Sequence, residues 1–150
     1  MRTPDLDALY REVVLDHYRS PRGRHPVAHP HRKSEGKNPL CGDEVELALE
    51  MADGRIRAVQ VRARGCSISV ASGSMLAELL PGKTLEEARR LIKTFKSMMR
   101  GEPAQEGVDM GDLDALEGVR RFPVRIKCAL LPWTTLEEAM RDERSAEQET

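Results

Sequence analysis

The sequence has few aromatic residues, few cysteines and no long apolar run. Aromatic side chains make up 3% of the 150 residues, so a core must be built mainly from Leu, Val, Ile, Ala and Met. A chain of this length can bury enough surface to fold as one domain over 1–150 without disulfides, and its three cysteines are an odd number. No segment approaches the ~18 apolar residues of a membrane-spanning helix. We therefore expect a cytoplasmic protein with reduced thiols and no membrane partner.

The chain also has no excess of charge of one sign, because its 24 Lys and Arg residues are balanced by 25 Asp and Glu residues. Residues 19–37 depart from this balance, with six basic residues and three histidines: His25, His29 and His31. Prolines between the histidines prevent a helix that would align them as metal ligands, and the basic neighbours repel a cation. The segment has no aromatic residue to stack on a base, so we expect no nucleic-acid partner. We interpret it as a flexible, solvated loop, with docking of a partner protein as the alternative.

Two strands are expected from the alternation of apolar and polar residues over 45–51 and 55–65. Asp53-Gly54 between them has the composition of a tight hairpin turn. The alternation slips once near Ala58, as it does at a β-bulge. The sequence therefore predicts an antiparallel hairpin.

Helical spacing of apolar residues predicts most of the remaining elements. The expected helices cover 5–18, 67–80, 85–100, 113–119, 123–133 and 136–145. Thr84 with Glu87, and Thr135 with Glu138, have the spacing of capping boxes, and the second box separates the last two helices. A polar tail follows at 142–150. The fold class is α+β, with a small antiparallel sheet packed against several helices.

Two of the three thiols lie at the ends of the predicted hairpin. Cys41 and Asp43 are two residues apart before the first strand, so in extended backbone both side chains point to one side, and Gly42 allows a bend. Cys66 follows Gly65 at the start of a helix, where the helix dipole favours a thiolate. Because a hairpin places the start of its first strand opposite the end of its second, Cys66 is expected beside Cys41 and Asp43.

Cys128 lies on an expected helix, and the sequence alone does not bring it to the hairpin. A lone cysteine is often only a small buried apolar residue. If Cys128 does join the others, three thiolates and one carboxylate form a donor set suited to zinc or to iron in a sulfur-bridged cluster. Arg121, Arg125 and Lys127 could then offset the negative charge of this site.

Five motifs occur in order over residues 6–141: LYREVVLDHYRSPR, NPLCGDEVEL, GCSISVASGSM, GKTLEEA and FPVRIKCALLPW. On these motifs the chain resembles the U-type iron–sulfur cluster assembly proteins, the IscU, SufU and NifU N-terminal family. The resemblance implies the SufE/NifU-like fold. It also implies that Cys41, Asp43, Cys66 and Cys128 form one site.

Two features of the sequence resemble the SufU branch of that family. Lys127 stands where the IscU branch has a histidine, and the segment between Cys66 and Cys128 is longer. The resemblance implies Zn²⁺ bound by the four site residues. A protonated Lys127 cannot be a ligand, so we expect electrostatic roles for Lys127 and Arg125. It implies at most a zinc-dependent sulfurtransferase, which takes persulfide sulfur from a pyridoxal-phosphate cysteine desulfurase of the SufS or IscS type. Cys41 would be the acceptor, and an iron–sulfur scaffold or apo-proteins would follow downstream.

Other functions stay open at this point. The same four residues could carry iron or a transient [2Fe–2S] cluster in a scaffold that assembles and transfers it. A structural zinc domain is a third interpretation, although a carboxylate ligand is unusual there. A hydrolytic zinc enzyme needs an open coordination position and a general base, and the sequence has no HExxH motif.

Overall fold

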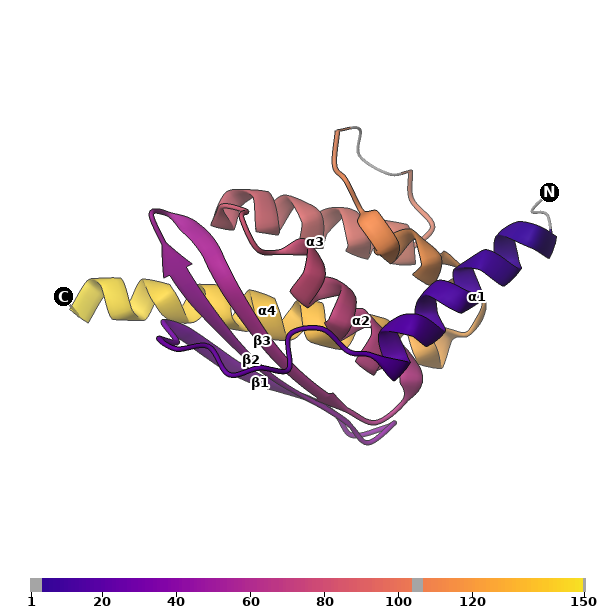
Figure 1. Cartoon of the computed structure of the whole chain (residues 1–150), viewed down its shortest axis with the longest axis horizontal. Coiled ribbons are helices and arrows are strands. Elements are labelled where there is room, and N and C mark those ends of the chain that lie inside the picture. Colours follow the sequence, from indigo (N-terminus) through magenta and orange to yellow (C-terminus); the bar gives the residue numbers. More distant parts are fainter. Residues whose placement is uncertain (1–3, 104–106, 150) are drawn as a thin grey trace.

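The structure is a computed structural model that describes residues 4–103 and 107–149, with side chains for 8–103 and 107–141. The elements in chain order are α1 (Pro4–Arg19), β1 (Arg32–Asn38), β2 (Asp43–Ala52), β3 (Arg55–Arg64), α2 (Ser67–Leu79), α3 (Leu85–Met99), the 3-10 helix η1 (Gly111–Arg121) and α4 (Pro123–Glu149). The strands form one antiparallel sheet in the order β1-β2-β3, and α2 and α4 pack against it (Figure 1). The predicted α+β class is confirmed.

The predicted hairpin is β2 and β3. Asp53 and Gly54 both have positive φ, 54° and 75°. A two-residue hairpin turn with positive φ at both positions matches the right-handed twist of its two strands. The register shifts between Glu50 and Met51, which pair with Ala58 and Ile56. The predicted bulge is therefore present at the predicted place.

The prediction of an irregular segment over 19–37 is wrong for residues 32–37. Together with Asn38 they form β1, which pairs with β2 along its whole length, from Arg32 opposite Leu49 to Asn38 opposite Asp43. The sequence RKSEGKN contains no β-branched or aromatic residue, so its strand conformation comes from pairing with β2 and not from local propensity. Gly36 allows α4 to approach closely, because a Cβ there would lie 2.1 Å from Thr135 Oγ1.

The rest of this basic segment is fixed by hydrogen bonds to the hairpin. The backbone N–H of Val61 in β3 donates to the carbonyl of Gly23 at 2.7 Å. His29 donates its backbone N–H to Glu50 Oε1 at 2.9 Å, and the backbone N–H of Met51 donates to His31 Nδ1 at 3.0 Å. The segment thus runs from the outer edge of β3, at Gly23, to the end of β2, at His29 and His31. The three histidines do not form a cluster of metal ligands in the described part of the chain.

The helices follow the predicted spacing, with one difference at the C-terminus. The capping box of Thr84 and Glu87 is present at the start of α3. The two helices expected on either side of Thr135 are instead a single helix, α4, which contains Pro132 and extends to Glu149. Thr135 is not a cap, because its hydroxyl donates to the Leu131 carbonyl at 2.8 Å within the helix. Pro132 removes only one backbone N–H, and packing of α4 on β1 and β2 maintains the helix.

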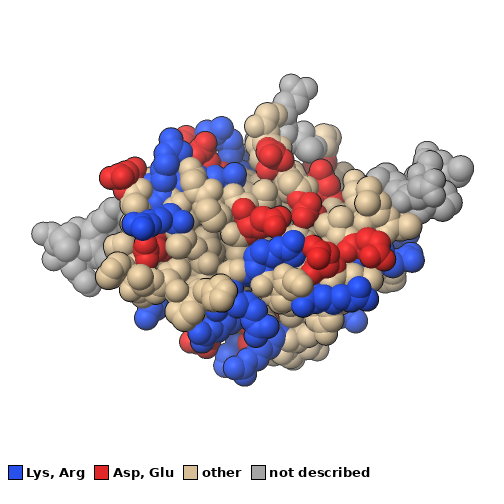
Figure 2. Space-filling model, in the orientation of Figure 1, with Lys and Arg blue, Asp and Glu red and all other residues tan. Residues whose placement is uncertain are grey.

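One hydrophobic cluster joins the sheet to the helices, and it includes Phe95 and Trp133 with ring centroids 5.5 Å apart. Basic and acidic side chains are interspersed over the face drawn in Figure 2, in line with the net charge of −1. Among the described residues, no helix is both long and apolar enough to cross a membrane.

Candidate metal centre

The predicted ligands converge at the end of the sheet where β2 begins and β3 ends. Ligand atoms of Cys41, Asp43 and Cys128 all lie within 4.8 Å of one another. Cys66 lies beside this group, with its Sγ 3.7 Å from Asp43 Oδ2. The structure therefore brings the three thiols and the carboxylate together, including Cys128, which sequence reasoning alone could not place.

Cys41 lies in a turn and not in extended backbone. β2 begins at Asp43, and the carbonyl of Asn38 accepts the backbone N–H groups of Cys41 at 3.2 Å and Gly42 at 2.8 Å. Gly42 has a φ of +71° in open surroundings. The expectation that extended backbone aligns Cys41 with Asp43 is thus wrong, because the Asn38 turn and the left-handed glycine place Cys41 instead.

Asp43 is fully buried and held in one orientation. Its Oδ1 accepts the backbone N–H of Cys66 at 2.8 Å, which leaves Oδ2 on the side of the Cys66 sulfur. Gly65 makes this contact possible, since a Cβ at that position would lie 2.1 Å from Asp43 Oδ1. One carboxylate oxygen therefore fixes the geometry while the other remains available as a ligand.

Cys66 directly precedes α2, where the positive end of the helix dipole favours a thiolate. A hydrogen bond to this thiol, together with its charge, raises the pKa of Arg125 above its ordinary value. Arg125 thus lies beside the Cys66 thiol, and its electrostatic role stays a prediction. Lys127 is exposed and has no contact with the thiols among the described interactions, so its predicted role stays a prediction.

Cys128 is fully buried in the second turn of α4. Burial raises the pKa of its thiol well above the ordinary value, and contacts with Asp43, Cys41 and Cys66 act in the same direction. Without a cation at this site the thiol therefore stays protonated at neutral pH. A bound metal ion would reverse that preference, because a coordinating thiol is deprotonated.

A buried serine ties α2 to α4 and so sets the position of Cys128. The hydroxyl of Ser72 in α2 donates to the carbonyl of Ala129 at 2.6 Å, and Trp133 Nε1 donates to the same hydroxyl at 3.0 Å. Sequence reasoning missed the roles of Ser72 and Trp133. In the sequence, the only indication of these roles is that Ser72 lies among the small residues of a helix expected to be closely packed.

A second cluster of potential ligands contains His17, Glu78 and Asp112, whose ligand atoms also lie within 4.8 Å of one another. His17 lies on α1 and is fully buried. Its Nδ1 lies 2.7 Å from Ser74 Oγ and its Nε2 lies 2.7 Å from Asp112 Oδ2. These partners satisfy both ring nitrogens, so His17 serves to join α1 to α2 and η1.

Comparisons with known proteins agree with this geometry. The family described as the NifU-like N terminal domain matches residues 9–129. The zinc-dependent sulfurtransferase SufU of Bacillus subtilis is 40% identical over 139 residues, covering 93% of this chain and 94% of the relative. The iron–sulfur cluster assembly scaffold protein IscU of Streptococcus pyogenes is 35% identical, covering 100% and 94% respectively.

The same agreement holds for solved structures. The crystal structure of a putative iron–sulfur cluster assembly scaffold protein for the SUF system from Fervidobacterium islandicum superimposes with a TM-score of 0.80 at 37% identity. The match covers 85% of this chain and 93% of that chain. Sequence and fold together show that the chain belongs to the NifU-like N-terminal domain family.

Proposed function

We propose that this protein acts in iron–sulfur cluster assembly as a zinc-bound acceptor of persulfide sulfur. The observation that carries the proposal is the convergence of three thiols and one buried carboxylate at one end of the sheet. The SufU relative, whose name states a zinc-dependent sulfur transfer, supports it.

The donor set fits zinc in kind and in spacing. Zinc prefers four ligands in a tetrahedron, and Zn–S bonds of about 2.3 Å place two sulfur ligands about 3.8 Å apart. The ligand atoms of Cys41, Asp43 and Cys128 all lie within 4.8 Å of one another, so they are grouped closely enough for a single ion to bind them. Cys66 would complete the set from its place beside Asp43. Zinc bound here would keep the thiols deprotonated near neutral pH.

Differences in exposure support Cys41 as the sulfur acceptor. Among the thiols Cys128 is fully buried, whereas Cys41 and Cys66 are both partly exposed. Cys41 differs from Cys66 in lying on a turn next to Leu40, which has 77% of its surface exposed. The Cys41 thiolate would attack the outer sulfur of the donor's persulfide. A new S–S bond then forms at Cys41 while the donor's S–S bond breaks, and the donor cysteine leaves as a thiolate, so no external oxidant is needed.

The sulfur donor in this proposal is a cysteine desulfurase of the SufS or IscS type. A cavity of about 570 Å³ lies next to the start of α2 and is lined by residues of α1, α2, η1 and α4. Phe122 on its rim is 59% exposed, and Arg11, Arg121 and Arg125 supply positive charge. Exposed apolar and cationic side chains next to Cys66, which belongs to the same site as Cys41, suit the docking of a partner protein. The sulfur would pass on to a scaffold or to apo-proteins, in the cytoplasm.

Metal analysis of protein purified without added metal tests the proposal. We expect about one zinc per chain, lost in Asp43→Asn and in Cys128→Ala. Asp53→Asn is the matched control, because Asp53 lies at the other end of the same hairpin in the turn, where asparagine is equally suitable. Equal zinc content in Asp43→Asn and Asp53→Asn would contradict the ligand assignment.

Sulfur transfer needs a second measurement. After incubation with cysteine and a desulfurase, mass spectrometry should find added sulfur on Cys41, and none in Cys41→Ser. The IscU relative keeps the [2Fe–2S] scaffold as the alternative function on the same residues. Iron with acid-labile sulfide in the purified protein, and no zinc, would favour that scaffold.

A further inference from the structure

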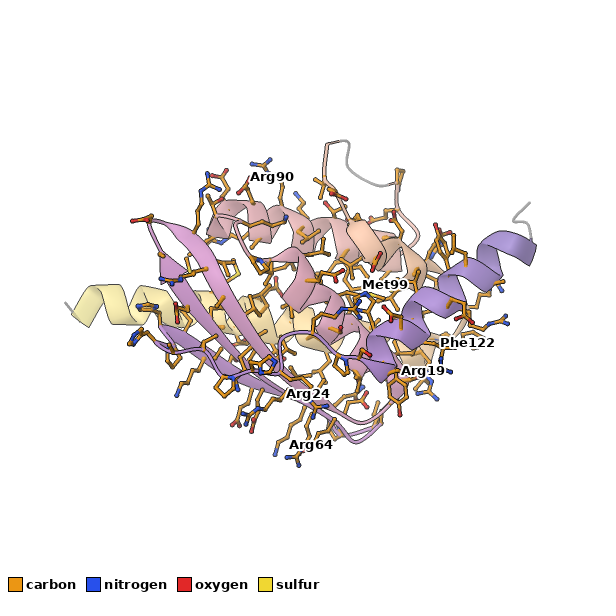
Figure 3. All side chains as sticks on the ribbon, in the orientation of Figure 1. Arg19, Arg24, Arg64, Arg90, Met99 and Phe122 are labelled. Atoms are coloured by element: carbon orange, nitrogen blue, oxygen red, sulfur yellow. The ribbon has the colours of Figure 1, made fainter. Side chains whose placement is uncertain are left out.

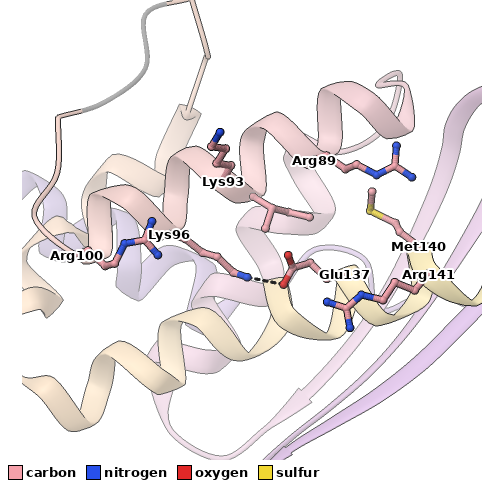
Figure 4. A pocket seen from close by; sticks show the side chains of 8 residues that line it. Arg89, Lys93, Lys96, Arg100, Glu137, Met140 and Arg141 are labelled. Atoms are coloured by element: carbon pink, nitrogen blue, oxygen red, sulfur yellow. Dashed lines mark hydrogen bonds and ion pairs between the residues drawn. The ribbon is translucent and has the colours of Figure 1, made fainter.

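A groove of about 490 Å³ lies between α3 and α4 (Figure 4). Cations line it from both helices: Arg89, Lys93, Lys96 and Arg100 from α3 and its C-terminal end, and Arg141 from α4. Glu137 is the one acidic residue in its lining. We call this feature the α3–α4 cationic groove.

Most of the charges in this groove are paired, but two are available. Lys96 forms an ion pair with Glu137 across the groove (Figure 4). Arg141 pairs with Glu138 at 3.0 Å. Arg89 and Lys93 are exposed and have no acidic partner within residues 8–103 and 107–141. The groove therefore has positive charge in excess at one end.

The spacing of the cations along α3 is that of one side of a helix. Arg89, Lys93, Lys96 and Arg100 follow one another at intervals of four, three and four residues. At a rise of 1.5 Å per residue they extend over about 16 Å. A second helix that carries carboxylates at the same intervals could pair with them in register.

The residues that line the groove do not suit a small apolar molecule or a nucleic acid. Ile92 and Met140 lie there and are only 2% and 4% exposed, so no apolar pocket is open for a small molecule. No aromatic side chain lines the groove, so nucleic-acid bases would find no surface on which to stack. Recognition here depends on charge along the helix.

We propose that the α3–α4 cationic groove is a docking surface for an acidic helical segment of a partner protein. Glu137 and Arg141 follow Cys128 on α4 by 9 and 13 residues, or about 14 to 20 Å along the helix axis. A partner in the groove therefore leaves the candidate metal centre uncovered. The proposal does not rest on the proposed function.

Fluorescence anisotropy with the full zinc-loaded chain tests the proposal at low ionic strength. The probe is a labelled helical peptide with glutamates at positions i, i+4, i+7 and i+11. A peptide of the same composition with scrambled glutamates and a single-stranded oligothymidylate serve as comparisons. The variants are Arg89→Ala/Lys93→Ala and, as control, Arg62→Ala/Arg64→Ala, which removes the same charge from exposed positions on β3. Figure 3 shows Arg64 and the α3 residue Arg90 at opposite edges of the molecule.

We expect the patterned peptide to bind, and the α3 double variant to weaken binding roughly fivefold, as expected for the loss of two exposed charge pairs. The β3 control should change binding less than about twofold. Zinc content and sulfur acceptance should be unchanged in the α3 variant. Equal binding of the scrambled peptide, equal weakening by the β3 control, or tighter binding of the oligothymidylate would each overturn the proposal.

Discussion

Replacing Gly65 with alanine perturbs the candidate metal centre through a single added carbon. The backbone at Gly65 has a φ of +120°, and a Cβ there would lie 2.1 Å from Asp43 Oδ1 and 2.9 Å from Asp43 Cα. Neither atom can move freely, because Asp43 is fully buried and Oδ1 accepts the backbone N–H of Cys66. We expect the carboxylate to be displaced and this hydrogen bond to be lost.

Two costs add up in this variant. An alanine at positive φ costs about 1–3 kcal/mol, and a hydrogen bond to a charged group contributes about 1.5–3 kcal/mol. The free energy of unfolding should therefore fall by roughly 2.5–6 kcal/mol, which many domains of this size survive. Displacement of a ligand should also weaken zinc binding by about 10- to 100-fold, as loss of a supporting contact does in other metal sites.

Gly82→Ala is the matched control, because Gly82 has a φ of +91° and no atom lies within 4 Å of the position that its Cβ would take. It carries the backbone cost alone, about 1–3 kcal/mol. Urea unfolding of the metal-free proteins and zinc retention against a chelator give the two readouts. If Gly65→Ala and Gly82→Ala lose equal stability and retain zinc equally, the close approach of Gly65 to Asp43 does not hold the site.

Three further predictions concern contacts elsewhere in the fold. Ser72→Ala leaves the buried Trp133 N–H without its partner and should cost about 1–3 kcal/mol by urea unfolding. Trp133→Phe should cost less in the Ser72→Ala background than in the wild type, and equal costs in the two backgrounds would contradict the contact. Thr84→Ala should cost about 1 kcal/mol through loss of the capping box, against almost no change for Thr134→Ala. The hydrogen bond from the Thr84 backbone lowers the pKa of Glu87 below its ordinary value of 4.5. The ionised Glu87 therefore stabilises the fold above about pH 4.5, and this stabilisation is lost as the pH falls through the lowered pKa. Glu87→Gln should remove this part of the pH dependence of unfolding.

The part of the site that depends on local structure could be predicted from the sequence. The Asp53-Gly54 turn sets the register of the hairpin, and Glu44 pairs with Arg64 as a result. Asp43 and Cys66, which lie just beyond this pair, therefore meet without any further information. Turn chemistry and alternation are properties of adjacent residues, which is why this half of the site was accessible from the sequence.

β1 was missed because nothing in its own residues favours a strand. Its six charged or polar side chains and one glycine suit a loop, and only the edge of β2 gives its backbone hydrogen-bond partners. The same pairing places Asn38 opposite Asp43, and Asn38 then forms the turn that carries Cys41. The position of Cys41 thus depends on a tertiary contact, although Cys41 is close to Asp43 in sequence.

The position of Cys128 depends on Gly36 and Thr135, although the types of these two residues suggest only local roles in the chain. Gly36 is typical of a loop and Thr135 of a helix cap, yet they mark the point where α4 crosses β1. Cys128 precedes Thr135 by seven residues, about 10 Å of helix, while Asn38 lies about 7 Å from Gly36 along β1, opposite Asp43. The crossing at Gly36, together with the Ser72 contact to Ala129, accounts for the arrival of Cys128 at the end of the sheet that carries Asp43.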